Sequence, residues 1–295
     1  MRIAIITPVR NEAAHLEKTI ECMLHQDHFP NIWIIVNDGS TDDTEMLLQN
    51  YSYINFIKVL TLKNRGFRQP GKGVIDSFYA GYNLIEDRIC DFDIISKFDG
   101  DLSFQPDTLH EISKAFKMDS KLGIIGPTLK ESSADGKVLH KLLIPKGMVN
   151  GPMKFYRKEC FFEIGGLIRR AGWDGVDTVK ANMLGWNTGE LNYVMAIHLR
   201  PTGTNPAEGE KRAGIKYGDV SYFMGGSFWY FILRVIGRSF EGKSWKIGWY
   251  MLIGYFYSMF KIRERETKEF RKYLKLQQIN NLIFYLKTFY SKFES

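Results

Sequence analysis

A regular alternation of two sequence patterns in the first hundred residues constrains the fold most strongly. Four short runs rich in isoleucine and valine, residues 2–7, 31–36, 54–60 and 94–98, predict buried strands. The segments between them carry polar loops and apolar residues at helical spacing, which indicates helices. Because strands that alternate with helices form parallel sheets covered on both faces, we expect an α/β fold with a doubly wound, mostly parallel sheet.

Acidic residues follow the fourth expected strand, in the sequence Asp99-Gly100-Asp101. In open α/β sheets ligands bind at the carboxyl ends of the strands, where the loops after successive strands meet. The residues expected around this crevice are Thr7, Pro8, Arg10, Glu12, Asp38, Asp99 and Asp101. Two carboxylates separated by one glycine suit a Mg²⁺ or Mn²⁺ ion that also binds substrate phosphates. The alternative is a polar turn without a metal, because Asp-Gly is a frequent turn dipeptide.

Two common phosphate-binding motifs are absent from the sequence. No G-x-G-x-x-G follows the first expected strand, which excludes the usual dinucleotide fingerprint. Gly71-Lys72-Gly73 lacks the P-loop pattern and follows no strand directly, so we do not expect P-loop phosphate binding.

The chain is basic, with a formal net charge of +7, and residues 261–295 contain nine Lys or Arg against four Glu. That segment favours an anionic surface, although a solvated helical face has the same composition. The three scattered cysteines are typical of reduced thiols in the cytosol. No signal-peptide pattern precedes the first strand, and the longest uncharged runs are shorter than the roughly 20 residues that span a bilayer. We therefore expect a cytoplasmic protein, either free or peripheral at the inner face of the membrane.

Five motifs occur in one order along about the first 200 residues: I-I-T-P-V-R-N-E, V-N-D-G-S-T-D-D-T, N-R-G-F-R-Q-P-G-K-G, F-D-G-D and a G-G-L…G-W-D-G-V-D-T-V…G-W-N run. Each lies at the end of an expected strand or the start of an expected helix. Together they resemble the family 2 glycosyltransferases of GT-A fold. The resemblance implies a GT-A domain, which we place at residues 1–220, followed by a helical extension at residues 221–295.

The resemblance also implies a binding site for a nucleotide-sugar donor. The residues implied to line it are Thr7, Pro8, Arg10, Glu12, Asp38, Arg65, Lys72, Asp99 and Gly100. Asp38 would accept a hydrogen bond from the base, and Arg65 and Lys72 would contact the ribose and diphosphate. Each of these two basic side chains would equally suit a solvated loop.

The metal ligands implied by the resemblance are Asp99 and Asp101, for Mn²⁺ or Mg²⁺. His198, at the end of an expected strand, is a candidate third ligand, although single histidines often have structural roles. Residues 203–218 contain several glycines, and we interpret them as a mobile lid over the donor. The basic residues of that stretch expected to meet the diphosphate are Lys211, Arg212 and Lys216.

The acceptor hydroxyl needs a general base, which a carboxylate within hydrogen-bond reach supplies. The family's base position matches Asp177, and Val176 stands where the family commonly has the first residue of a Glu-Asp pair. We favour Asp177 as the base. Asp174 lies about one helical turn earlier and is the alternative, although it also suits a helix-capping role.

The C-terminal part has a different composition. Residues 227–236 and 245–260 are rich in Trp, Tyr, Phe and Met, and a basic run follows at residues 261–275. Aromatic residues beside lysines and arginines suit a helix that lies in a membrane interface. The alternatives are packing against the catalytic domain and a homodimer contact.

The resemblance implies metal-dependent, inverting transfer of a single sugar from a UDP- or GDP-sugar to a hydroxyl acceptor. We expect the acceptor to be a glycan or lipid-linked saccharide in cell-surface polysaccharide synthesis. Single transfer is favoured because the Q-x-x-R-W motif of the processive family members is absent. Two alternatives are a nucleotide-sugar-binding or scaffold protein without turnover, and a nucleotidyltransferase. Nucleic-acid binding is not expected, because no recognised module appears.

Overall fold

The computed structural model describes residues 1–67, 69, 71–132, 139–141, 144–200, 209–240 and 245–291. The chain divides into two compact units, Met1–Pro201 and Thr202–Ser295. Residue 220, where we expected a domain boundary, lies within a helix of the second unit. The division of the chain into functional domains at that position stays a prediction.

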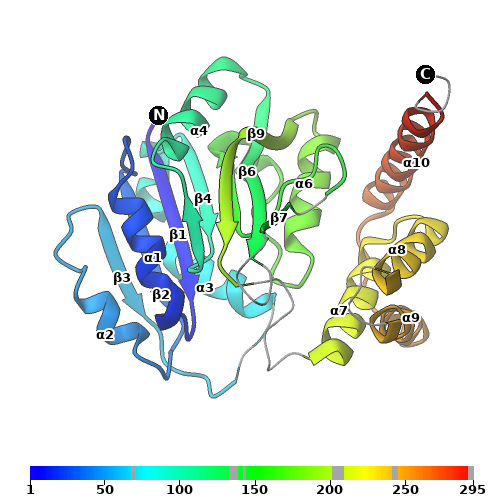
Figure 1. Ribbon diagram of the computed structural model, residues 1–295, viewed down its shortest axis with the longest axis horizontal. Helices are drawn as coiled ribbons and strands as arrows, with labels where there is room; N and C mark the ends of the chain where they lie inside the picture. Colours follow the sequence, from blue (N-terminus) through cyan, green and yellow to red (C-terminus); the bar gives the residue numbers. More distant parts are fainter. Residues whose placement is uncertain are drawn as a thin grey trace. The chain divides into compact units, whose positions relative to one another are not determined.

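A mixed sheet forms the centre of the first unit, with the strand order β3-β2-β1-β4-β8-β6-β9-β5 and with β7 paired to β6 (Figure 1). The strands are β1 Ile3–Val9, β2 Ile32–Asn37, β3 Ile57–Thr61, β4 Ile94–Phe98, β5 Leu102–Phe104, β6 Leu122–Ser132, β7 Leu139–Lys141, β8 Met153–Arg157 and β9 Asn187–His198. β1 pairs in parallel with β2 and β4, and β2 with β3, whereas β8 runs antiparallel to β4 and β6. The mostly parallel α/β fold expected from the sequence is confirmed.

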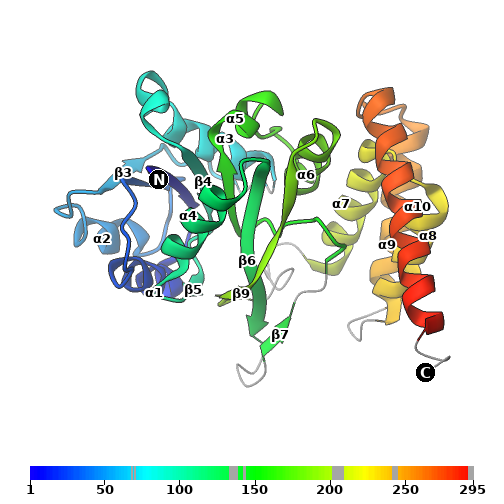
Figure 2. The same cartoon turned by 90° about the horizontal axis from the view of Figure 1, so that it is seen from above.

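Helices cover both faces of this sheet (Figure 2). They are α1 Ala13–Leu24, α2 Thr44–Gln49, α3 Lys72–Tyr82, α4 Thr108–Met118, α5 Lys158–Glu163 and α6 Trp173–Met183, with a 3₁₀ turn at Glu86–Asp91. Successive side chains of a strand point to opposite faces. Ile3 and Ile5 of β1 accordingly join a core with α1 and α4, whereas Ala4 and Ile6 join a core with α3, α5 and α6. Burial on both faces explains why β1 is apolar at four successive positions, residues 3–6, rather than alternating.

β1 continues through Pro8 to Val9, although the sequence predicts a strand that ends at residue 7. Pairing with β4 ends at Ile6, whereas pairing with β2 continues to Val9. Pro8 therefore lies where the strand has one neighbour, and a residue without an N–H group is tolerated there.

The described residues of the second unit form α7 Gly209–Met224, α8 Phe228–Phe240, α9 Trp245–Phe260 and α10 Lys268–Ser291. The prediction of a mobile lid is wrong over residues 209–218, because these residues belong to α7 and not to a loop. Gly203 lies outside the described residues. A Cβ atom on Gly218 would collide with the Met251 carbonyl oxygen of α9, and one on Gly254 would collide with the Ile215 carbonyl oxygen of α7. These glycines therefore allow two helices to approach closely. In the described part of the chain, no helix combines the length and the apolar character needed to cross a bilayer.

Candidate active site

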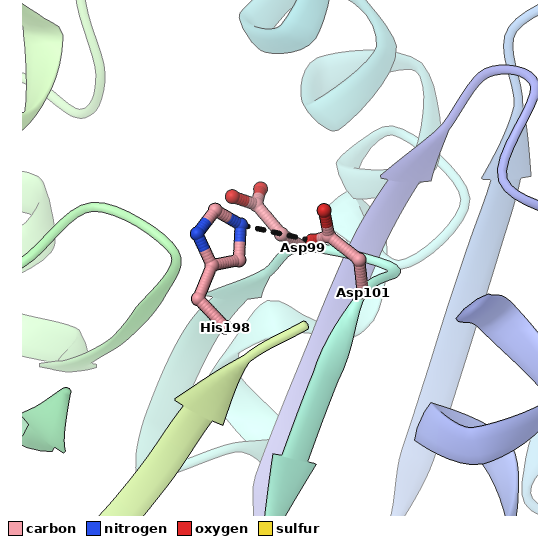
Figure 3. Close-up of side chains that lie close together, drawn as sticks. All are labelled: Asp99, Asp101 and His198. Atoms are coloured by element: carbon pink, nitrogen blue, oxygen red, sulfur yellow. Dashed lines mark hydrogen bonds and ion pairs between the residues drawn. The ribbon is translucent and has the colours of Figure 1, made fainter. Parts of the chain in front are cut away.

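Three potential metal ligands meet at the edge of the sheet, and Figure 3 shows their side chains. Asp99 follows β4 and Asp101 precedes β5, while His198 is the last residue of β9. Antiparallel pairing of β5 with β9 places Leu102 opposite His198, which brings His198 beside Asp101. The imidazole Nε2 lies 3.1 Å from Asp101 Oδ1, and one ligand atom from each of the three residues lies within 4.8 Å of the others.

The chemistry of this group fits a divalent cation. Carboxylate oxygens suit Mn²⁺ and Mg²⁺, and a neutral imidazole nitrogen is a common additional ligand. Burial disfavours a charged His198, but hydrogen bonds to Asp101 and Glu131 prevail and raise the pKa of His198 to about 10. Since a metal ligand must be deprotonated, metal binding at this group would release the proton of His198.

Gly100 lets the two aspartates turn tightly against the core. A Cβ atom on Gly100 would lie 2.6 Å from Val9 Cγ1, closer than side chains pack. The Thr19 hydroxyl donates to the Gly100 carbonyl oxygen at 2.9 Å and accepts from the Leu102 N–H at 2.8 Å. A glycine at position 100 therefore allows this turn to pack against the core, while its place in a donor site stays a prediction.

Arg200 joins this group and was missed by the sequence reasoning. Its Nη2 atom lies 2.7 Å from Glu12 Oε1 and 2.9 Å from Asp101 Oδ2. Glu12 thus lies beside the candidate metal group. Burial opposes the charged carboxylate of Asp101, but His198 and Arg200 prevail and hold its pKa below the usual value. The signal available in the sequence was the position of Arg200, two residues after His198.

A second group of charged side chains lies around Asp38, which follows β2. Arg65 forms a two-point ion pair with the Asp38 carboxylate, with Nη1 2.8 Å from Oδ1. Arg10 donates to the Asp38 carbonyl oxygen and, at 2.8 Å, to Asn64 Oδ1. Burial raises the pKa of Asp38, while Arg65 and Arg10 oppose the rise. The structure therefore brings together three of the residues expected to bind the donor.

The remaining donor-site candidates have different surroundings. The Thr7 hydroxyl is fully buried and accepts from Trp33 Nε1 at 2.9 Å, so this side chain belongs to the core. Lys72, the first residue of α3, is exposed and bonds Asp76 at 2.6 Å, one turn along the same helix. Among the described residues, the ion pair of Lys72 is with Asp76 and not with Asp38 or Asp99. Pro8 is half-buried next to Thr7.

The two candidate bases differ sharply in environment. Asp177 is buried, and its oxygens lie 2.8 and 2.9 Å from Lys154 Nζ and 2.5 Å from the Tyr156 hydroxyl. Asp174 keeps part of its surface exposed, and burial raises its pKa. A Cβ atom on Gly151 would lie 2.9 Å from Asp174 Oδ2. The adjacent Pro152 carbonyl accepts from the Asp99 N–H at 2.8 Å, so the same short segment contacts both Asp174 and Asp99.

Several known proteins resemble this chain. Hyaluronan synthase of Pasteurella multocida is 28% identical over 126 residues, 42% of this chain and 12% of the synthase. Chondroitin synthase of Pasteurella multocida (strain Pm70) is 25% identical over 138 residues, 46% of this chain and 13% of the synthase. The chain therefore matches only a small part of the length of these curated relatives.

Solved structures share the fold at low sequence identity. A mannosyltransferase from Pyrobaculum calidifontis, in complex with GDP-Man and Mn²⁺, has a TM-score of 0.54 at 14% identity, covering 99% of this chain and 88% of its own. S. aureus TarS 1-349 with UDP-GlcNAc has a TM-score of 0.54 at 16% identity, covering 89% and 74%. GalNAc-T7 with UDP, GalNAc and Mn²⁺ has a TM-score of 0.58 at 12% identity, covering 88% and 57%.

These neighbours are GT-A glycosyltransferases, and they confirm the GT-A fold of the first unit. The model of the family described as "Glycosyl transferase family 2" matches residues 4–171, more than half of the chain. The chain therefore belongs to glycosyl transferase family 2.

Proposed function

We propose that this glycosyltransferase moves one sugar from a UDP- or GDP-sugar to a hydroxyl acceptor, with Mn²⁺ or Mg²⁺ and with inversion at the anomeric carbon. The observation that carries the proposal is the convergence of Asp99, Asp101 and His198 at the edge of the sheet. These three residues would hold the ion. A bound divalent ion would supply Lewis-acid stabilisation of the leaving diphosphate.

The nucleotide is expected to bind beside Asp38. Its carboxylate can accept from the N–H of uracil, or from the ring N–H and amino group of guanine. Arg65 bonds both oxygens of the Asp38 carboxylate. The ion pair therefore presents hydrogen-bond donors and acceptors to a nucleotide in a fixed arrangement. Of the similar solved structures, TarS was solved with a UDP-sugar and the Pyrobaculum calidifontis mannosyltransferase with a GDP-sugar. This supports both donor classes but does not distinguish between them.

The candidate base is Asp174 rather than Asp177, which we had favoured from the sequence. A general base must reach the acceptor hydroxyl and have room to take a proton. The carboxylate of Asp177 is enclosed by Lys154 and Tyr156, whereas Asp174 is partly exposed beside Gly151. A base on the face opposite the leaving diphosphate gives inversion in a single displacement.

We propose further that the second unit binds an anionic lipid surface, where a lipid-linked or surface glycan acceptor would be found. Among the described residues, ten large apolar residues of α8 and α9 are exposed, including Phe228 and Met259. The other eight are named here the aromatic stripe: Trp229, Leu233, Ile236, Trp245, Trp249, Ile253, Tyr257 and Phe260. On each helix they recur at intervals of three or four residues and therefore share a face. Neither helix contains Asp or Glu, whereas they contain Arg234, Arg238 and Lys246, which favours acidic headgroups.

A turnover assay separates the proposed function from its alternatives. The protein is incubated with a panel of UDP- and GDP-sugars, saccharide acceptors and Mn²⁺, and released nucleoside diphosphate and glycosylated product are both measured. We expect one donor to give both products, with loss of both in EDTA. Binding without release would indicate a scaffold protein. Release of pyrophosphate from a nucleoside triphosphate and a sugar 1-phosphate would indicate a nucleotidyltransferase.

A further inference from the structure

Two buried lysines lie side by side beneath the candidate base. Lys97 of β4 and Lys154 of β8 are register partners in the antiparallel pair. Their side chains are 2% and 0% exposed. Both ammonium groups face the ring of Trp173, at 5.0 and 5.7 Å from its centroid. Buried cations require partners, and Lys97 pairs with Asp99 while Lys154 pairs with Asp177.

Lys154 also fixes the first turn of α6 to the sheet. Its Nζ atom lies 2.6 Å from the Asp174 carbonyl oxygen and 3.0 Å from Thr178 Oγ1, in addition to its contacts with Asp177. The Tyr156 hydroxyl donates to Asp177 from the same strand, β8. The backbone that carries the Asp174 carboxylate is therefore attached directly to the buried ion pair.

We propose that Lys154 and Asp177 are positioning residues for Asp174: together they anchor its backbone, and by cancelling each other's charge they leave no net charge beside its carboxylate. The inference rests on the proposed function, in which Asp174 is the base. Both side chains are buried, so neither would contact the substrate.

The charged groups around Asp174 act in opposite directions. Burial raises the pKa of Asp174 most strongly; Lys154 lowers it, Asp177 raises it and Lys97 of β4 lowers it. The pKa of Tyr156, which also faces this group from β8, is raised well above its usual value by burial and by Asp177, so its hydroxyl stays protonated. Removal of one member of the Lys154–Asp177 pair therefore leaves the opposite charge uncompensated near Asp174.

The test is a direct titration of Asp174 by the ¹³C shift of its carboxyl carbon, in protein labelled at aspartate and with the signal assigned from the Asp174→Asn variant. Asp177→Asn should lower the titration midpoint by about one pH unit, because Lys154 loses its counter-charge. Lys154→Met should raise the midpoint by about one unit for the opposite reason. The double variant should return it to within about 0.3 unit of the wild type.

A matched control is Lys180→Met, which removes a lysine charge from the same helix at a half-exposed position. Solvent screens such a charge, so its midpoint should move by less than about 0.3 unit. Single variants that shift the midpoint in the same direction, or not at all, overturn the inference.

A second readout covers variants that do not fold. If either single variant is unfolded by circular dichroism, the double variant decides the question. It should keep the wild-type midpoint but lower kcat about tenfold with an unchanged donor KM, because the Asp174 carbonyl has lost its anchor. A double variant with wild-type kcat contradicts the positioning role.

The titration needs no turnover. Absence of transferase activity in the wild type would therefore refute the proposed function, while the titration result would still hold.

Discussion

Asp174 and Asp177 lie one helical turn apart at the start of α6, yet only Asp177 is enclosed by a lysine and a tyrosine from β8. Two aspartates that are both candidate bases by their position in the sequence therefore have different surroundings in the structure. Asp177 is the counter-charge of Lys154, whereas Asp174 lies beside Gly151, whose neighbour Pro152 accepts from the Asp99 N–H.

The first prediction concerns the base. Asp174→Asn should lower kcat by about 10²–10⁴ with little change in donor KM, because general base catalysis typically contributes that factor. Steady-state kinetics with saturating Mn²⁺ measure it. Because burial raises the pKa of Asp174, the wild-type rate should fall as the pH drops through a value above the usual aspartate pKa of about 3.9. Wild-type kcat in Asp174→Asn would remove this residue from the mechanism.

The second prediction concerns the nucleotide. Asp38→Ala should raise the donor KM about tenfold to a hundredfold while kcat changes little, because a charged hydrogen bond to a ligand is worth about 1.5–3 kcal/mol. Arg65→Met should have a similar effect, since it removes the partner that fixes the Asp38 carboxylate. Lys72→Met is the control, because Lys72 pairs with Asp76 at the surface. The donor KM of this variant should stay near the wild-type value. Equal effects of all three variants would contradict a specific role for Asp38.

The third prediction concerns the glycines of the second unit. Gly218→Ala should destabilise the packing of α7 against α9, because the added Cβ atom would meet the Met251 carbonyl oxygen. Gly237→Ala in α8 is the matched control, since no atom lies within 4 Å of its Cβ position. That substitution should stabilise the protein by up to about 1 kcal/mol through helix propensity. Urea unfolding compares the two, and equal stabilities would show that Gly218 is not needed for close packing.

The fourth prediction concerns the lipid surface. Replacement of Trp245 and Trp249 by serine should reduce sedimentation with vesicles containing phosphatidylserine, and raised salt should weaken binding of the wild type. Tyr53→Ser is the control, because Tyr53 is more exposed than either tryptophan but lies in the first unit. If the wild type does not bind vesicles and instead forms a dimer that the tryptophan variant abolishes, the aromatic stripe is a protein interface.

Local sequence patterns were sufficient to predict the strands of the parallel half and the meeting of Asp99 with Asp101. They also placed His198 at the end of a strand, whereas its candidacy as a ligand came from the resemblance to the family. The partners of these residues could not be found in this way: Arg200 and Glu12 are 188 positions apart, and Lys97 and Lys154 meet only through strand pairing. The choice between Asp174 and Asp177 depends on which side of α6 faces β8, and helical spacing alone does not determine that orientation.

The most direct test of the proposed metal site is Mn²⁺ binding in the presence of UDP or GDP, monitored by electron paramagnetic resonance. One ion should leave the free pool for each chain, and the bound ion should show a nitrogen coupling from His198 that disappears in His198→Gln. Asp101→Asn should abolish binding while circular dichroism shows a folded protein. If the wild type binds the nucleotide while Mn²⁺ stays free in solution, Asp99, Asp101 and His198 do not form a metal site and the proposed chemistry is wrong.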